Sequence, residues 1–208
     1  EAPGIGETAA RLAATGDGAA LAYVVKTTHL QHGGKLSLAR VLRGHLDDGA
    51  TVQSSSGGAG RIAGILAANG AGDSKRALAE AGDVVALGKL DAMKTGDTLT
   101  TAKTAPAPLA EMSAAPAVLA IALAANDRKD DVKLGQALQR LTEEDPSLKV
   151  QHNPANHEMV LWGQGEMHLR VAMERLQERY GVNAKSHPPG VGYQETIRKS
   201  ATQRGRHK

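Results

Sequence analysis

The stretch WGQGEMHLRVAMERL, residues 162–176, decides the fold of the second half of the chain. Two glycines flank Gln164, an acid follows them, and apolar residues then recur at helical spacing. Gly181 stands where a left-handed residue commonly ends a helix. The pattern predicts a sharp strand-to-helix turn and an amphipathic helix whose apolar face consists of Leu169, Ala172, Met173, Leu176 and Tyr180.

A second helix is predicted upstream, over residues 130–145. Leucines recur there at i, i+4 and i+7, Asp130 or Asp131 can cap the start, and Pro146 follows the end. The recurring leucines are Leu134, Leu138 and Leu141.

Short strands are predicted around these two helices. The apolar run AVLAIALA (117–124) fits a buried strand, SLKVQHN (147–153) and EMVLW (158–162) fit a hairpin, and VNAKSH (182–187) fits a last strand. The resulting order β-α-β-β-α-β is the ferredoxin-like arrangement.

The first half of the chain has a different pattern. Turn residues recur about every ten positions between β-prone runs, without a convincing helical stripe, which favours a small antiparallel β-barrel. Residues 104–116 are rich in alanine and proline and predict an extended linker between two domains.

Composition excludes several classes of protein. The 208 residues contain no cysteine, so disulfides and thiolate chemistry are absent. No apolar run is long enough to span a bilayer and no signal-peptide pattern opens the chain, so we expect a cytoplasmic protein without a membrane partner. Aromatic residues make up 2% of the chain, which counts against modules that stack many bases.

The net charge of +3 is concentrated at the C-terminal end. Five basic residues and no acid lie within residues 197–208, namely Arg198, Lys199, Arg204, Arg206 and Lys208. Such a run attracts phosphate backbones, and it is equally typical of a solvated chain end.

The phosphate-binding patterns in the sequence are incomplete. Gly34 and Lys35 resemble the end of a P-loop, but Leu36 occupies the position of the magnesium-binding hydroxyl. The turn at residues 163–165 opens a helix, yet Glu166 places its own carboxylate at the helix N-terminus. A structural turn is therefore the preferred interpretation.

Acid-base or metal chemistry is also disfavoured. Glu166 and His168 are two residues apart on a helix and so point to different faces. The other histidines, His29 with His32 and His152 with His157, match no metal-binding spacing, so surface positions are expected for them.

Several stretches in register resemble elongation factor G. The second half resembles domain III and the entry to domain IV of that family, through LTEEDPSLKV, GQGEMHLRVAMERL, YGVNA and PPGVGYQETI. The first half resembles domain II, the β-barrel of translational GTPases, through GKLSLARVLRGHLDDGATV, AGDVVALGKL and TGDTL. Met167 and Gln194 depart from the usual Leu and Arg and suggest a divergent, elongation factor G-like paralogue.

The resemblance implies a division of the chain. We expect a trailing connection from a GTPase domain outside the chain over residues 1–17, a β-barrel domain II over 18–103, a linker over 104–116, a ferredoxin-like domain III over 117–190 and a truncated start of domain IV over 191–208.

The implied function is the non-catalytic middle portion of a translational GTPase. It would bind the ribosome and couple the GTP state to domain movement in translocation or ribosome recycling. GTP and Mg²⁺ would belong to the GTPase domain, and no catalytic, cofactor-binding or metal-binding residue is expected within the chain. The expected partners of this monomer are ribosomal RNA, small-subunit proteins and its own GTPase domain.

Two groups of site residues follow from the resemblance. Interdomain contacts are expected at Gln164, Gly165, Glu166 and His168. Contacts with ribosomal RNA phosphates are expected at Arg198, Lys199, Arg204, Arg206 and Lys208. The alternatives are a free-standing acylphosphatase-type hydrolase, which needs an anion-binding loop with a nearby Arg and Asn, and an independent RNA-binding module.

Overall fold

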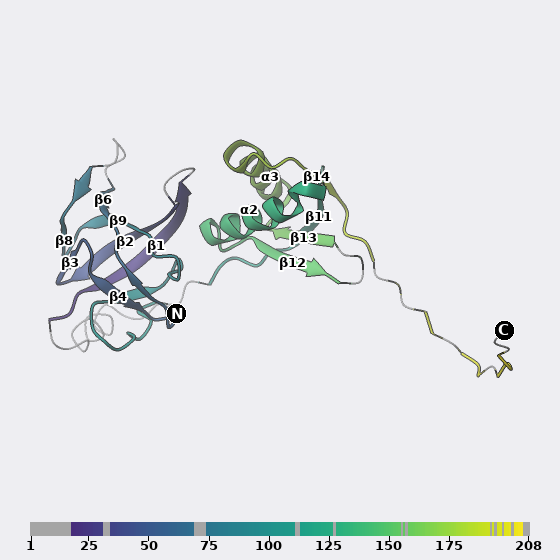
Figure 1. Ribbon diagram of the computed structural model, residues 1–208, viewed down its shortest axis with the longest axis horizontal. Coiled ribbons are helices and arrows are strands. Elements are labelled where there is room, and N and C mark those ends of the chain that lie inside the picture. Colours follow the sequence, from purple (N-terminus) through teal and green to yellow (C-terminus); the bar gives the residue numbers. More distant parts are fainter. Residues whose placement is uncertain are drawn as a thin grey trace.

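Two bodies and an extended tail make up the part of the chain that the structure describes (Figure 1). The structure is a computed structural model, and it describes residues 18–30, 34–68, 74–110, 113–126, 128–154, 156, 158–191, 193, 195–196, 198–200 and 202–205. The first body is built from strands, and the second combines a sheet with helices. Among the described residues, no helix is both long and apolar enough to cross a membrane.

The first body is a barrel-like assembly of antiparallel strands. Its largest sheet has the order β5-β4-β10-β1-β2-β9-β6-β7, and β3 pairs with β8 as a separate ribbon. The terminal strands β5 and β7 of the described sheet are not paired with each other, so the sheet is curved without being closed. The strands are β1 (Leu21–Leu30), β2 (Gly34–Arg43), β3 (His45–Asp47), β4 (Thr51–Ser54), β5 (Ala59–Arg61), β6 (Ile65–Ala67), β7 (Lys75–Arg76), β8 (Leu78–Glu80), β9 (Val84–Gly88) and β10 (Thr98–Thr100).

The alternating apolar residues of β1 and β2 build the core of this body. Val24 is fully buried, and a register shift between Val24 and Lys26 then leaves Val25 and Lys26 both exposed before Thr27 returns to the interior. Such a bulge bends a strand and increases its twist. The large side chains that fill the core come from β3, β6, β9, β10 and adjoining loops: Leu46, Ile62, Ile65, Leu87, Leu90, Met93 and Leu99.

The segment after β10 stays close to the barrel before it reaches the second body. The Leu109 amide donates a hydrogen bond of 2.9 Å to the Thr98 hydroxyl, and the Leu109 side chain is buried. This part of the predicted linker therefore packs on the first body, although its prolines had indicated an extended spacer outside both cores.

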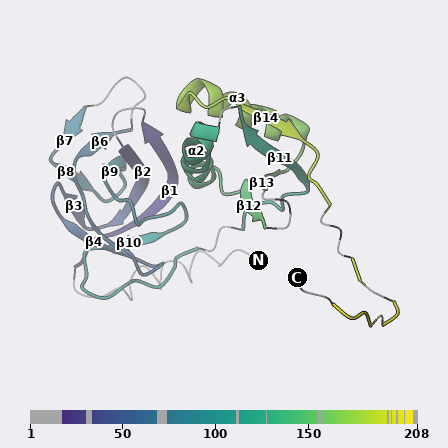
Figure 2. The ribbon, with the colours of Figure 1, turned by 45° about the vertical axis from the view of Figure 1, so that its right-hand side comes forward.

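The second body has the predicted ferredoxin-like order. Its strands pair as β12-β13-β11-β14, all antiparallel, and both helices lie on one face of the sheet (Figures 1 and 2). A short 3-10 turn, η1 (Arg128–Asp130), precedes the first helix. The elements are β11 (Leu119–Ala125), α2 (Asp131–Glu144), β12 (Lys149–Asn153), β13 (Glu158–Gly163), α3 (Glu166–Tyr180) and β14 (Ala184–His187).

The predicted apolar faces of α2 and α3 form the core beneath them. Leu134, Leu138 and Leu141 of α2 pack with Leu169 and Leu176 of α3 over Leu161 of β13. Met173 and Tyr180, also predicted on the face of α3, are half-buried against the same cluster.

The sequence predicted the C-terminal end of α3 better than the N-terminal end of α2. Gly181 adopts the left-handed conformation with φ 63°, and its amide donates to the Gln177 carbonyl, so the predicted C-cap is confirmed. Asp130 immediately precedes α2, but its side chain makes no capping hydrogen bond. Its carboxylate lies 3.2 Å from the Lys133 ammonium group instead.

Candidate functional site

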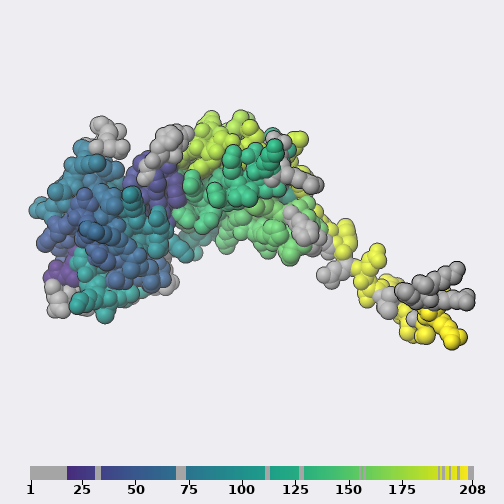
Figure 3. Space-filling model, in the orientation of Figure 1, coloured from purple at the N-terminus to yellow at the C-terminus, as the bar shows by residue number. Residues whose placement is uncertain are grey.

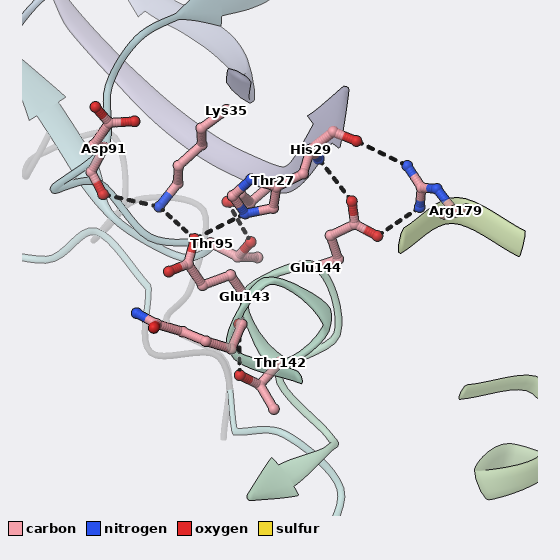
Figure 4. Close-up of polar contacts among 10 residues, drawn as sticks. Thr27, His29, Lys35, Asp91, Thr95, Thr142, Glu143, Glu144 and Arg179 are labelled. Carbon is pink, nitrogen blue, oxygen red and sulfur yellow. Dashed lines mark hydrogen bonds and ion pairs between the residues drawn. The ribbon is translucent and has the colours of Figure 1, made fainter. Parts of the chain in front are cut away.

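The two bodies meet through charged side chains (Figure 4). The first body contributes the hairpin formed by β1 and β2, and the second contributes the C-terminal ends of α2 and α3. Neither hydrophobic core cluster contains residues from both bodies. The hydrogen bonds and ion pairs between them are polar contacts of the kind found between domains that move relative to each other. We call the residues His29, Lys35, Glu143, Glu144 and Arg179 the interdomain cluster.

Glu144 is the most buried acid of the cluster, with 5% of its side chain exposed. One carboxylate oxygen accepts the backbone N–H of His29 at 2.6 Å, and the other accepts Nη1 of Arg179 at 2.7 Å. Nη2 of Arg179 donates to the backbone carbonyl of His29 at 3.0 Å. Glu144 and Arg179 of the second body thus bind the backbone N–H and the backbone carbonyl of His29 in the first body, as Figure 4 shows.

Lys35 and Glu143 form a second contact beside these hydrogen bonds. Lys35 Nζ lies 3.0 Å from the Asp91 carbonyl oxygen, to which it donates, and 3.0 Å from Oε2 of Glu143. The same Glu143 oxygen lies 2.9 Å from Nε2 of His29. Only 4% of the Lys35 side chain and 11% of the His29 side chain are exposed, whereas 29% of the Glu143 side chain is, so two largely buried groups meet an acid at the rim of the contact.

The β1–β2 register explains why His29 and Lys35 act on the same acid. The two residues are direct cross-strand partners, so their side chains project from the same face of the hairpin. Glu143 lies in the last turn of α2, where it faces this pair. Burial alone would raise the pKa of Glu143, but hydrogen bonds and charge from Lys35 and His29 outweigh it and lower that pKa.

A polar cleft adjoins the interdomain cluster. Its volume is about 580 Å³, and both bodies line it. The first body supplies His29, Lys35 and Asp91, and α2 supplies Gln136, Gln139, Arg140 and Glu143. Water and ions can therefore reach the edge of the ion pairs, which makes the contact sensitive to solution conditions.

The predicted site residue His168 is held inside the second body. Its Nδ1 accepts the backbone N–H of Gln164 at 3.1 Å, and its Nε2 lies 3.0 Å from a carboxylate oxygen of Asp145. Because Nδ1 of His168 accepts a hydrogen bond, Nε2 carries the proton and donates a hydrogen bond to the Asp145 carboxylate. The imidazole therefore joins the start of α3 to the residue that follows α2.

Asp145 is itself fixed by a neighbouring turn. The Ser147 hydroxyl and amide donate to its other carboxylate oxygen at 2.5 and 3.1 Å. Burial alone would raise the pKa of Asp145, but hydrogen bonds from Ser147 and His168 outweigh it and lower that pKa. The EEDP and GQGEMH stretches, separated in the sequence, thus meet at one hydrogen bond.

The other predicted interdomain residues lie at the surface of this turn. Gln164 and Glu166 are exposed, Gly165 is half-buried, and Met167 beside them is 65% exposed. Glu166 is the first residue of α3 and points to solvent, whereas His168 turns toward Asp145. The described residues also contain no group of three or more His, Asp or Glu side chains placed to hold a metal ion.

The two glycines of the turn have different roles. A Cβ on Gly163 would lie 2.9 Å from Leu169 Cδ2 and 3.2 Å from His168 Nδ1. A Cβ on Gly165 would meet no atom within 4 Å, and its φ of 171° is extended backbone open to any residue. Close packing therefore requires the first glycine only.

The predicted RNA-contacting tail extends away from both bodies (Figures 1 and 3). Arg198, Lys199 and Arg204 are exposed. Arg206 and Lys208 lie outside the described residues. Phosphate binding by this tail stays a prediction.

Sequence reasoning missed the interdomain cluster. The expectation of a surface position is wrong for His29, whose side chain is largely buried against Glu143. His152 is exposed, as expected, whereas His32 and His157 lie outside the described residues. The local signals for this cluster in the sequence were Lys35 after two glycines and the acids Glu143 and Glu144 at the end of a predicted helix.

Comparison with known proteins matches both bodies to one family. The family model for elongation factor G domain 2 matches residues 19–102, and the model for Elongation Factor G, domain III matches residues 114–188. Together they span the barrel-like body and the ferredoxin-like body.

Individual relatives agree with these matches. An elongation factor G-like protein of Synechocystis sp. is 41% identical over 210 residues, covering 100% of this chain and 30% of that protein. An elongation factor G-like protein of Mycobacterium tuberculosis is 36% identical, covering 95% and 30%, and an elongation factor G of Pseudothermotoga lettingae is 35% identical, covering 92% and 27%. The chain therefore spans about 30% of the length of these relatives.

A solved structure shares the fold. A crystal structure of a Thermus thermophilus protein superposes with a TM-score of 0.71 at 33% identity, covering 87% of this chain and 27% of that chain. The similarity extends over most of both bodies.

Proposed function

Because the chain carries the second and third domains of the elongation factor G family, we propose that it is the ribosome-binding, non-catalytic middle portion of a translational GTPase. Its role would be to couple the GTP state to domain movement in translocation or ribosome recycling. The observation that supports coupling is the interdomain cluster, in which Glu144 and Arg179 of domain III hold His29 of domain II.

The polar nature of that contact suits a part that moves. Each body has its own hydrophobic core, so the two can separate without exposing either one. A bound nucleotide shifts such an equilibrium only if its contacts differ between the two arrangements. We propose that a GTPase domain outside these residues, with its GTP and Mg²⁺, supplies this bias.

The turn at residues 163–168 is the proposed contact with the GTPase domain. Gln164, Glu166 and Met167 face solvent, and His168 anchors the turn from behind through Asp145. A surface held in this way is ordered before its partner arrives, which lowers the entropy cost of association. The exposed tail residues Arg198, Lys199 and Arg204 are the proposed contacts with ribosomal RNA phosphates.

Ribosome pelleting of the protein joined to its GTPase domain tests this proposal. We expect co-sedimentation to be strongest with a non-hydrolysable GTP analogue and weakest with GDP, because the nucleotide would bias domain positions. Arg179→Met should weaken the nucleotide dependence, since it removes contacts with both Glu144 and His29. Absent binding, or binding equal in all nucleotide states, would contradict the proposed function.

GTP binding by the 208-residue chain alone gives a second test. The chain should neither bind nor hydrolyse GTP by itself, because we assign both activities to the GTPase domain. Equilibrium dialysis with labelled GTP measures binding directly, and saturable binding by the chain alone would overturn that assignment.

A further inference from the structure

The sheet of the second domain is covered by helices on one face only (Figures 1 and 2). Ile121 and Leu123 of β11 and Leu161 of β13 pack with the helices. Because successive side chains of a strand point to opposite faces, the residues between them face the other way. We call this second surface the open sheet face; it contains Ala120, Ala122, Lys149, Val160, Trp162 and Lys185.

Trp162 lies in a central strand of the open sheet face. It pairs with Lys149 of β12 on one side and with Ala120 of β11 on the other. Trp162 is half-buried and belongs to neither hydrophobic core cluster. Ala120 beside it is half-buried like Trp162, whereas Ala122 and Val160 farther along the face are buried.

Cations flank this aromatic centre. Lys149 lies on the edge strand β12 and Lys185 on the opposite edge strand β14, where it pairs with Ala124, and both side chains are exposed. Given a strand spacing of about 4.8 Å and a rise of about 3.4 Å per residue, the two lysines lie roughly 20 Å apart, because they are also offset by four residues along β11, a span that a few nucleotides can cross. The acid at one end of this face, Glu158, already accepts the Gly190 amide at 3.0 Å.

We propose that the open sheet face binds single-stranded RNA, with a base stacked on Trp162 and phosphates paired with Lys149 and Lys185. An aromatic residue on a central strand of a four-stranded sheet is how such sheets hold unpaired bases. Lysines are depleted at protein–protein interfaces, so their position at both margins favours a phosphate backbone over a protein partner. The proposal rests on the proposed ribosome binding, within which it names one RNA-contacting surface.

The single tryptophan provides a direct measurement. Trp162 is the only Trp in the chain, so its fluorescence reports on this site alone. Titration with a short oligouridylate should quench that fluorescence, because stacking brings a base against the ring. Inorganic polyphosphate, which has charge without bases, should leave the emission unchanged.

Matched variants separate stacking from charge. Trp162→Leu should weaken binding of fluorescently labelled oligouridylate by about 5-fold to 150-fold, the range that base–aromatic stacking supplies. The pair Lys149→Glu with Lys185→Glu should weaken binding and make it less dependent on salt. The control pair Lys133→Glu with Arg175→Glu changes the net charge equally on exposed positions of α2 and α3, and should bind as the parent does.

Defined outcomes overturn the proposal. No quenching by oligouridylate would do so, as would equal losses in the two charge-reversed pairs. Parent-like affinity in Trp162→Leu, with its fold confirmed by circular dichroism, would also exclude stacking. If the open sheet face cross-links to a ribosomal protein instead of RNA, a protein is its partner. Should ribosome pelleting persist without any oligouridylate binding, only this inference fails and the proposed function stands.

Discussion

At the scale of single residues, the turn before α3 separates two glycines that look equivalent in the sequence. Gly163→Ala would place a methyl group 2.9 Å from Leu169 Cδ2 in the core, whereas Gly165→Ala would enter open space. Overpacking a core costs about 1–3 kcal/mol, so we expect Gly163→Ala to lower the free energy of unfolding by that amount. Gly165→Ala should change it by less than about 0.5 kcal/mol. Urea unfolding followed by circular dichroism measures both, and equal losses would contradict this packing argument.

His168 and Asp145 give a second prediction at this scale. His168→Leu removes a hydrogen bond to a half-buried carboxylate, and Asp145→Asn leaves an amide that cannot accept from both Ser147 and His168. Each change should lower the free energy of unfolding by about 1–2 kcal/mol.

A double-mutant cycle tests that pair. Because the two residues share one contact, the double variant should lose clearly less than the sum of the single losses. His45→Leu, at an exposed position on the first domain, serves as the control and should have little effect. Additive losses would show that His168 and Asp145 do not act together.

At the scale of elements, the second domain was predictable because its signals are local. The leucines of α2 recur every three or four residues, and Gly181 ends α3 where the sequence predicts. The same reasoning could not find the Asp130 side chain pairing with Lys133 instead of capping α2. It also missed the packing of Leu109 on the barrel, because alanine and proline content says nothing about which linker side chain is buried.

The interdomain cluster was beyond sequence reasoning for a physical reason. Its hydrogen bonds join residues 114, 115 and 150 positions apart, and no periodicity relates such partners. His29 and Lys35 become neighbours only through the β1–β2 register. For the turn at residues 163–168, the sequence predicted a sharp strand-to-helix turn and the different directions of Glu166 and His168. It did not predict the contact of His168 with Asp145, which holds the turn in place.

At the scale of the whole molecule, we expect the relative position of the two domains to depend on Arg179, which contacts both Glu144 and the His29 carbonyl. Arg179→Met removes a donor from the buried Glu144 carboxylate and another from the His29 carbonyl. We expect a wider distribution of interdomain distances in small-angle X-ray scattering, with each domain still folded. Arg170→Met is the matched control, because Arg170 lies on the same helix and pairs only with Glu174 among the described residues. A scattering profile unchanged in Arg179→Met would show that the contact does not set the arrangement.

The domain arrangement should also depend on pH through Glu143. Its pKa is lowered when Lys35 and His29 contact it, so the docked arrangement favours the ionised carboxylate. A group with a lowered pKa contributes fully above its free value, about 4.3 for Glu, and loses that contribution as the pH falls through the docked value. The titratable and charged groups near it are Lys35 and His29 from the hairpin, with Arg140 and Glu144 on its own helix. Fluorescence resonance energy transfer between labels on the two domains should therefore report separation on acidification below about pH 4. Glu143→Gln should dock more weakly at neutral pH and lose this pH response. If Glu143→Gln and the parent protein separated at the same acidic pH, a group other than Glu143 would be responsible for the response.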